Sequence, residues 1–270
     1  MRVATFNILS GRHPERSGVD VDAFADAVLA IDADVLALQE VDRDQPRSSH
    51  GDLTAVAAEA MGAVAHRFVP ALRGTPEQWV AADGVGDVAP GGPAYGVALL
   101  SRYPVTTWDV IRLPPMPGRT PYRWPGALLP TLVADEPRVA VVAGIDAPGG
   151  PLTVVTTHLS FLPWSSGRQL RRLVRGLAST PRPLLLVGDL NMAPPRARRI
   201  TGMTPLATHL TFPEIGTRLF VSRNTVKSEA VSIYRKLGVS SRSEAIERAV
   251  EIGLLESSVY PQGTNFTPEG

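Results

Sequence analysis

Up to about residue 200, apolar positions follow two different spacings along the chain. Short, nearly continuous apolar runs, typical of strands buried on both faces, cover residues 3–6, 35–38, 95–100, 139–142, 152–157 and 184–187. Between them, apolar residues three and four positions apart predict helices over residues 21–31, 53–61 and 168–178. Strands that alternate with helices in this way predict an α/β fold. Two stretches rich in Gly and Pro, residues 84–93 and 114–130, predict long loops of the kind that carry function or lack order.

The pattern changes after about residue 208. Residues 212–220, 222–237 and 241–254 have helical spacing with no strand between them, and the residues after Gly253 are polar and contain Pro and Gly. We therefore predict an α/β domain over residues 1–208, a small all-α unit over residues 209–256 and a flexible tail over residues 257–270.

Composition narrows the class of protein. Among 270 residues there are 27 Lys and Arg, 26 Asp and Glu and no Cys, so the formal net charge is +1. The missing cysteines exclude a disulfide scaffold, a thiolate zinc site and a cysteine nucleophile. The charge balance excludes a highly charged disordered protein and provides no overall attraction to nucleic acid. Without an apolar run of signal-peptide or membrane-spanning length, we expect a cytoplasmic protein with no membrane partner.

Residues 168–199 carry a local excess of basic residues. The segment contains one acidic residue, Asp189, and these arginines: Arg168, Arg171, Arg172, Arg175, Arg182, Arg196, Arg198 and Arg199. Such a cluster would attract a phosphodiester substrate, and an ordinary solvated helix face would have the same composition. Both interpretations remain open from the sequence.

Polar side chains follow several of the apolar runs. Asn7, Glu40, His158 and Asp189 each come shortly after a predicted strand, and Asn191 is close behind Asp189. Strand ends of an α/β sheet deliver side chains to a shared crevice. Carboxylates are hard oxygen ligands that suit Mg²⁺ or Mn²⁺, and a histidine with two amides would contact the oxygens of a phosphoester. Each residue alone is more simply a solvated loop residue or a helix cap, but their joint pattern favours a site.

The segments around these residues also carry a family resemblance. In order along the chain they are Thr5-Phe6-Asn7-Ile8, Leu38-Gln39-Glu40-Val41, Tyr95-Gly96-Val97-Ala98-Leu99-Leu100-Ser101-Arg102, Thr156-Thr157-His158-Leu159 and Gly188-Asp189-Leu190-Asn191. Together they resemble the endonuclease/exonuclease/phosphatase superfamily of metal-dependent phosphoesterases, over about residues 1–212. The resemblance implies a four-layered α/β sandwich whose two sheets meet at a divalent-metal site, and a phosphoester substrate such as nucleic acid.

The resemblance also implies a role for each polar residue. Glu40 would bind Mg²⁺ or Mn²⁺, with Asn7 and Asp189 at the same centre. Asp189 would orient or deprotonate the attacking water, Asn191 would position the phosphate, and His158 would stabilise the pentacovalent transition state. Phosphoryl transfer needs a metal ion and hydrogen-bond donors where negative charge develops, which agrees with these roles.

One part of the superfamily pattern is missing. The pattern closes with Asp-His pairs on its last strands, whereas this chain has no Asp after Asp189 and its last His is His209. The loss of a catalytic acid or base typically costs about two to four orders of magnitude in rate. We therefore expect a truncated domain with an open sheet edge and impaired catalysis.

The helical segment after residue 208 has the pattern of a helix-turn-helix. Ser222 suits an N-cap, an apolar stripe runs from Val226 to Leu237, and Gly238 suits a C-cap. Residues 207–256 resemble the C-terminal DNA-binding domain of LuxR-type transcriptional regulators, without a counterpart of that domain's first helix. The resemblance implies that residues 222–237 are a recognition helix for duplex DNA. The residues nearest DNA would be Arg223, Thr225, Lys227 and Ser228.

The joint between the two resemblances, residues 208–213, fits both families. Three hypotheses therefore remain open: a metal-dependent phosphoesterase or nuclease with impaired catalysis, a DNA-binding regulator whose helical tail carries the function, and a chimera in which neither half works. The sequence leaves the substrate, the metal, the DNA target and the oligomeric state undetermined.

Overall fold

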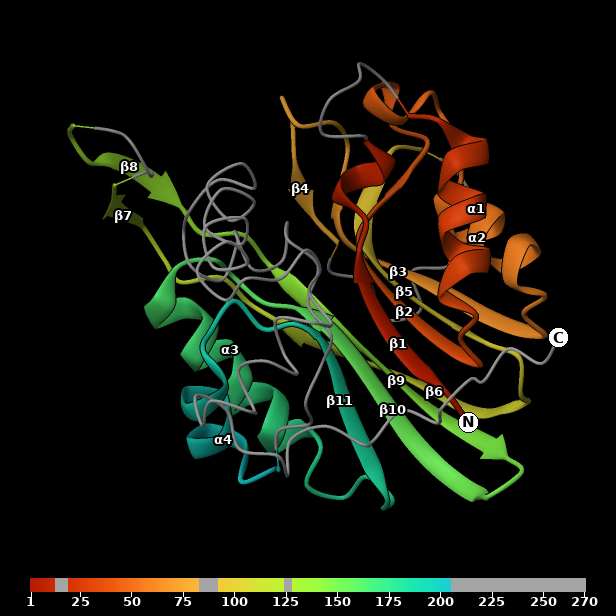
Figure 1. Ribbon diagram of the computed structural model, residues 1–270. Coiled ribbons are helices and arrows are strands. Elements are labelled where there is room, and N and C mark those ends of the chain that lie inside the picture. Colours follow the sequence, from red (N-terminus) through yellow and green to blue (C-terminus); the bar gives the residue numbers. More distant parts are fainter. Residues whose placement is uncertain (13–18, 83–91, 124–127, 205–270) are drawn as a thin grey trace, which may run out of the picture. The chain divides into compact units, whose positions relative to one another are not determined.

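The computed structural model describes residues 1–12, 19–82, 92–123 and 128–204 (Figure 1). The chain divides into two units, Met1–Met203 and Thr204–Gly270, and every helix and strand below belongs to the first. The predicted helix-turn-helix and tail lie outside the described residues. So do the predicted DNA contacts Arg223, Thr225, Lys227 and Ser228.

Two sheets form the centre of the first unit. The first sheet has the order β1 (Val3–Asn7), β2 (Val35–Arg43), β5 (Ala94–Ser101), β3 (Ala65–Arg73) and β4 (Val80–Ala81). The second has the order β11 (Leu184–Asp189), β10 (Gly150–His158), β9 (Arg138–Ala147) and β6 (Val105–Leu113). The pairs β1–β2 and β10–β11 are parallel, and the other neighbours are antiparallel.

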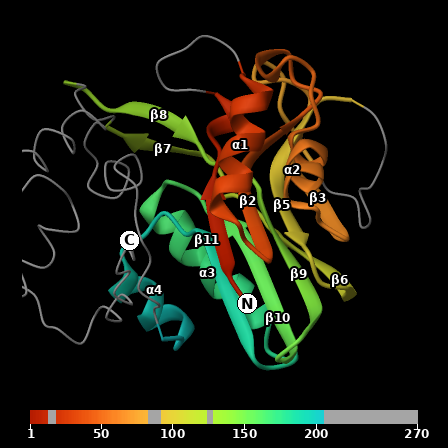
Figure 2. The same ribbon diagram turned by 45° about the vertical axis from the view of Figure 1, so that its right-hand side comes forward.

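Helices cover the outer face of each sheet, so the unit has four layers (Figures 1 and 2). The helices α1 (Val21–Ile31) and α2 (Leu53–Met61) pack on the first sheet, and α3 (Pro163–Gly176) and α4 (Pro194–Thr201) on the second. Asp20 caps α1 by accepting the Ala23 N–H, and Asp52 caps α2 in the same way. A short 3-10 helix follows β1 at Leu9–Gly11, and another follows β2 at Pro46–Ser48.

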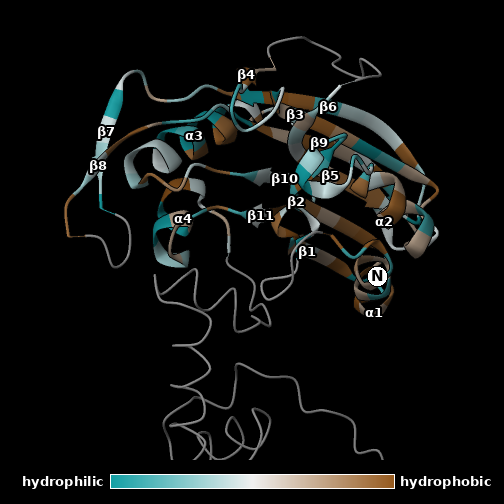
Figure 3. Cartoon of the chain, turned by 90° about the horizontal axis from the view of Figure 1, so that it is seen from above, coloured by the Kyte–Doolittle hydropathy of each residue, from teal (hydrophilic) through white to brown (hydrophobic). Residues whose placement is uncertain are grey.

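The central strands are apolar on both faces because each face meets another layer. In β2, Leu36 and Leu38 belong to the core beneath α1 and α2, whereas Val35 and Ala37 belong to the core between the two sheets. Hydrophobic segments are visible along β1 and β2 in Figure 3, whereas α4 is largely hydrophilic. This double burial explains why the sequence shows continuous apolar runs instead of strict alternation.

The predicted α/β class is confirmed, and each predicted strand lies within an observed one. Helices 21–31 and 53–61 have the predicted bounds, whereas α3 begins at Pro163 and not at residue 168. The strands β3 and β6 were not predicted. Residues 114–130 are not entirely a loop, because they contain β7 (Arg119–Tyr122), which pairs with β8 (Thr131–Ala134). Most of residues 84–93 lie outside the described part of the chain.

Within the described residues, β1 and β11 are the end strands of their sheets. The two strands contact each other, and every residue in both is half-buried. The predicted loss of the closing strands concerns residues beyond 204 and stays a prediction. In the same described ranges, no helix combines the length and the apolar character that crossing a bilayer requires.

Candidate functional site

Side chains from both sheets meet where β1, β10 and β11 end. Asn7 is the last residue of β1, His158 of β10 and Asp189 of β11. The Asn7 Nδ2 atom donates to Oε1 of Glu40 at 2.9 Å and to Oδ2 of Asp189 at 3.3 Å. The Nε2 atom of His158 lies 3.9 Å from the same Asp189 oxygen. The structure therefore brings together the residues that the sequence analysis singled out, although nothing in it tests their roles.

Glu40 does not follow a strand end, contrary to expectation, because it lies inside β2. The pairing of β2 with β5 shifts between Gln39 and Val41, which leaves Glu40 as the extra residue of a β-bulge. Its φ of 56° is in the left-handed region, which costs a non-glycine residue energy and often occurs at functional sites. The bulge re-aims the Glu40 side chain toward Asn7, which a regular strand would not do.

Gly96 on β5 makes room for this irregular region. It pairs with Val41 beyond the bulge of β2 and with Pro70 beside a second register shift, in β3. A Cβ atom at Gly96 would lie 2.1 Å from the carbonyl oxygen of Val69. Only glycine therefore allows β3 to approach β5 this closely at the level of the site.

Gln39, the residue before Glu40, links the two sheets. Its side chain is buried, accepts from the Thr5 hydroxyl at 3.0 Å and donates from Nε2 to Thr156 Oγ1 at 3.1 Å. Thr5 and Gln39 belong to the first sheet and Thr156 to the second. Sequence reasoning missed this role, although a glutamine inside an apolar run signals a buried polar contact.

The turns after β10 and β11 are tied to each other. Asp189 Oδ1 accepts the Asn191 N–H at 2.9 Å, and the Asn191 Nδ2 atom donates to the Leu159 carbonyl at 2.8 Å. Leu159 in turn donates its N–H to the Asp189 carbonyl at 2.9 Å. Gly188, with φ of 122°, allows the strands to approach, because a Cβ there would lie 2.1 Å from the Thr157 oxygen. These contacts link the ends of β10 and β11, which carry His158, Asp189 and Asn191.

Burial shifts the pKa values of two of these groups in opposite senses. Burial, together with the nearby Asp189, raises the pKa of Glu40, and the hydrogen bond from Asn7 offsets part of that effect. Burial and the Arg138 charge lower the pKa of His158 to about 3, despite the opposing effect of Asp189. His158 is therefore neutral near pH 7, and the charged form of Glu40 is costly unless a cation lies near it.

The donor set suits a hard divalent cation. Glu40 and Asp189 provide carboxylate oxygens on either side of the Asn7 amide, whose Oδ1 accepts the Leu9 N–H at 3.1 Å. Among the described residues, no group of three or more His, Cys, Asp or Glu side chains is arranged to hold a metal ion. Mg²⁺ is commonly held by one or two carboxylates with water in its other positions, so two carboxylates are a sufficient protein contribution.

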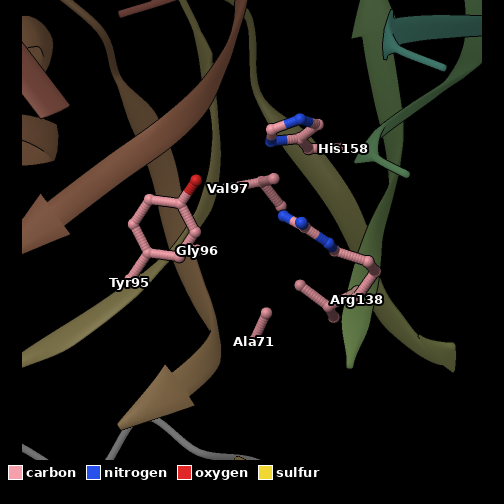
Figure 4. Close-up of a pocket in the computed structure, with 7 residues that line it drawn as sticks. Ala71, Tyr95, Gly96, Val97, Arg138 and His158 are labelled. Carbon is pink, nitrogen blue, oxygen red and sulfur yellow. The ribbon is translucent and has the colours of Figure 1, made fainter. Parts of the chain in front are cut away.

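A buried arginine also faces this corner, and the sequence analysis did not identify it. Arg138 is the first residue of β9 and is 6% exposed. Figure 4 shows its guanidinium group pointing between Tyr95 and His158, with which it lines a small pocket. A charged residue that opens an apolar strand was the available signal in the sequence.

A partly buried ion pair supports the Tyr95 side of this pocket. Arg47 donates from Nη2 and Nε to the two carboxylate oxygens of Asp42, at 2.7 and 2.8 Å. Its guanidinium lies over the rings of Trp79 and Tyr95, 5.8 and 5.4 Å from their centroids. The two-pronged pair and the cation–π contacts restrict the position of Tyr95.

The model of the Endonuclease/Exonuclease/phosphatase family matches residues 4–231. The matched range runs past residue 208, where the sequence pattern predicts a boundary, and overlaps the predicted helix-turn-helix. No curated protein matches the chain in sequence.

Several solved structures are similar to the chain. An endonuclease/exonuclease/phosphatase from Beutenbergia cavernae has 26% identity and a TM-score of 0.54, over 85% of this chain and 53% of that one. This chain thus spans about half the length of that relative. A mannosyl-6-phosphatase from Bacteroides thetaiotaomicron has 13% identity and a TM-score of 0.48, over 75% and 70% of the two chains. Sphingomyelinase C from Streptomyces griseocarneus has 18% identity and a TM-score of 0.48, over 76% and 70%.

Proposed function

The chain belongs to the endonuclease/exonuclease/phosphatase family, and from that premise we propose that it hydrolyses a phosphoester with a bound divalent cation, Mg²⁺ or Mn²⁺. One observation carries the proposal: the Asn7 amide donates to both Glu40 and Asp189, beside a buried His158. This arrangement links two carboxylates and a neutral imidazole through contacts of 2.9, 3.3 and 3.9 Å.

Glu40 would hold the cation, with Asp189 and Asn7 beside it. The pKa of Glu40 supports this role, because burial disfavours its charged form and a cation would compensate. When bound, a divalent cation polarises a phosphoryl oxygen and offsets the charge that develops on it.

Asp189 and His158 would act on the water and on the phosphoryl group. The Asp189 carboxylate would accept a hydrogen bond from the attacking water and orient it. His158, neutral near pH 7, would donate a hydrogen bond to a phosphoryl oxygen as its charge increases. Asn191 uses one amide hydrogen on the Leu159 carbonyl, and its second amide hydrogen would position the phosphate.

We propose that this hydrolysis is slow. Residues 190–270 contain no Asp-His pair of the kind that closes the family pattern, so these residues supply no such acid–base pair. The expected loss is about two to four orders of magnitude relative to a complete acid–base pair.

A phosphodiester, such as nucleic acid, is the substrate class that the surface charge favours. The helices α3 and α4 contain no acidic residue and carry exposed arginines, namely Arg168, Arg171, Arg172, Arg175, Arg198 and Arg199. A positive surface of this kind concentrates polyanions near the unit. A solvated helix face remains the alternative, and the relative rates on nucleic acid and on small phosphomonoesters distinguish the two.

The test is hydrolysis by the full chain. Bis(4-nitrophenyl) phosphate and 4-nitrophenyl phosphate are incubated with protein in Mg²⁺, in Mn²⁺ and in EDTA. We expect metal-dependent release of nitrophenol that Glu40→Gln abolishes, whereas the exposed Glu59→Gln leaves it unchanged. A wild-type rate equal to that of buffer would contradict the proposal.

We propose duplex DNA as a second partner, bound by residues 209–256. The support is the sequence pattern alone: an N-cap at Ser222, a continuous apolar stripe and a basic face that includes Arg223 and Lys227. Thr225 and Ser228 would lie on the same DNA-facing side. These residues are outside the described structure. We propose a cytoplasmic location together with this partner.

A further inference from the structure

Arg138 is a buried charge with incomplete hydrogen bonding. It is 6% exposed, and its Nη2 atom donates to Glu136 Oε2 at 3.0 Å. Its Nε atom is fully buried and has no hydrogen-bond partner. A guanidinium has five N–H donors, and a buried donor left unpaired costs about 1–3 kcal/mol. β9 therefore begins with a buried cation whose hydrogen bonding within the protein is incomplete.

A second unpaired nitrogen lines the same pocket. The Nδ1 atom of His158 is also fully buried without a hydrogen-bond partner. In Figure 4 the side chains of Arg138, His158 and Tyr95 point toward a common space, which has room for about one water molecule. A space of that size accommodates one oxygen atom of a larger ligand, and not the whole ligand.

The charges around the pocket favour an oxyanion over water. Glu136, the ion-pair partner of Arg138, has a side chain that is 40% exposed, so solvent screens its charge. Burial raises the pKa of Tyr95, so its hydroxyl keeps its proton and stays a hydrogen-bond donor. A guanidinium supplies donors only, and a phosphoryl oxygen supplies acceptors only.

We propose that Arg138, His158 and Tyr95 form a subsite that binds one non-bridging oxygen of a phosphoryl group, with Arg138 as the residue that binds it most strongly. We call these three residues the Arg138 subsite. The inference rests on the proposed function, because it assigns a contact for the phosphoester that Glu40 and Asp189 would process. It identifies a tetrahedral oxyanion as the class of ligand.

The position of Arg138 agrees with this role. His158, in the subsite, lies 3.9 Å from the Asp189 carboxylate, which itself is linked to Glu40 through Asn7. An oxygen held by Arg138 would therefore keep the phosphorus next to the two carboxylates. Since the guanidinium is always charged, this contact would operate over the whole pH range in which the protein is folded.

The first test measures inorganic phosphate binding by the shift in melting temperature, without reference to catalysis. The full-length wild type is compared with Arg138→Met and with a matched control, Arg67→Met, whose Nε atom is also buried and unpaired but lies on β3 away from the pocket. We expect phosphate to raise the melting temperature of the wild type and of Arg67→Met, and not that of Arg138→Met. Because Arg138→Met removes a poorly paired buried charge, we expect it to fold.

The second test measures kcat and KM for bis(4-nitrophenyl) phosphate in Mg²⁺. We expect kcat/KM to fall about 10- to 100-fold in Arg138→Met, the range for losing a charged hydrogen bond. Arg138→Lys, which keeps the charge and loses the planar fork, should recover part of the loss.

Two results would overturn the proposal. One is a phosphate-dependent shift that is absent in the wild type or unchanged in Arg138→Met. The other is an Arg138→Met variant that melts earlier but keeps wild-type kcat/KM, which would give Arg138 a structural role through Glu136. If the wild type hydrolyses no phosphoester, the proposed function fails, and the phosphate shift alone then decides the role of Arg138.

Discussion

Asn7 and Asp189 are 182 residues apart in the sequence and are joined by a hydrogen bond of 3.3 Å from Nδ2 to Oδ2. Asn7 ends β1 in the first sheet and Asp189 ends β11 in the second, so the bond crosses from one sheet to the other. The same amide nitrogen also reaches Glu40. The candidate site therefore exists only when the two sheets are packed together, and variants that loosen the packing should weaken the site.

Glu40→Gln should make the metal-free protein more stable at pH 7. The pKa of Glu40 is raised in the folded state. Between its pKa values in the unfolded and folded states, the folded state therefore binds more protons than the unfolded state. Stability is consequently lost as pH rises through the folded pKa, and a neutral glutamine removes the loss. Urea denaturation at pH 5 and pH 7 measures the free energy of unfolding of both proteins. Mg²⁺ should stabilise the wild type and not Glu40→Gln, and equal stabilisation of both would argue against Glu40 as a ligand.

Acid should destabilise the protein partly through His158. The pKa of His158 is lowered from 6.5 to about 3, so between these values the unfolded state binds the proton and the folded state does not. Stability should therefore fall as pH drops below about 6.5, with a slope that approaches about 1.4 kcal/mol per pH unit from this residue.

The wild type is compared with His158→Gln in urea at a series of pH values. The variant should lose less stability on acidification, and the exposed His66→Gln serves as the control. Parallel pH profiles for the wild type and His158→Gln would show that His158 is not buried in its neutral form.

Gly96→Ala should destabilise the protein by about 3 kcal/mol or more, the range for severe steric conflict in a core. The added Cβ would lie 2.1 Å from the Val69 oxygen and force β3 and β5 apart beside the bulge that carries Glu40. Gly149→Ala, where a Cβ meets nothing within 4 Å, is the matched control. Urea midpoints measure both, and a Gly96→Ala midpoint equal to that of Gly149→Ala would contradict the close approach of the strands.

Gln39→Leu should cost about 1–3 kcal/mol, because it leaves the Thr156 hydroxyl without its partner in the other sheet. Thr156→Val should cost a similar amount by leaving the Gln39 amide unpaired. The double variant should cost less than the sum of the two single variants, because it removes both members of this hydrogen bond and leaves neither of them unpaired. A double-mutant cycle in urea measures the coupling, and strictly additive costs would show that the inter-sheet bond contributes nothing.

Lys227→Ala should weaken binding of the full chain to duplex DNA. It should also reduce the slope of the logarithm of the binding constant against the logarithm of the salt concentration by about one. Fluorescence anisotropy at several salt concentrations measures both quantities. Lys236→Ala, outside the predicted contact set, serves as the control. If the wild type binds no duplex at low salt, residues 209–256 are not a DNA-binding unit.

Local sequence determined the main elements of the first unit. Helical spacing was enough for α1 and α2, because both helices bury one regular apolar stripe. The strands β2, β5, β9 and β10 were evident because burial on both faces demands continuous apolar runs. His158 and Asp189 could be predicted to converge because they end parallel neighbours at the same edge of one sheet, whereas Asn7 reaches them only through the packing of the two sheets.

The tertiary structure alone decided the rest. Pro70 obscured β3 in the sequence, and only the register shift beside Gly96 shows how a strand accommodates it. Glu40 has its position because a bulge in β2 redirects it, and no local pattern identifies which strand has an extra residue. The proposed role of Arg138 depends on its neighbour in the pocket, His158, which belongs to another strand. Spacing along the chain reports which face a residue occupies, whereas pairing between strands and packing between sheets decide which residues it meets.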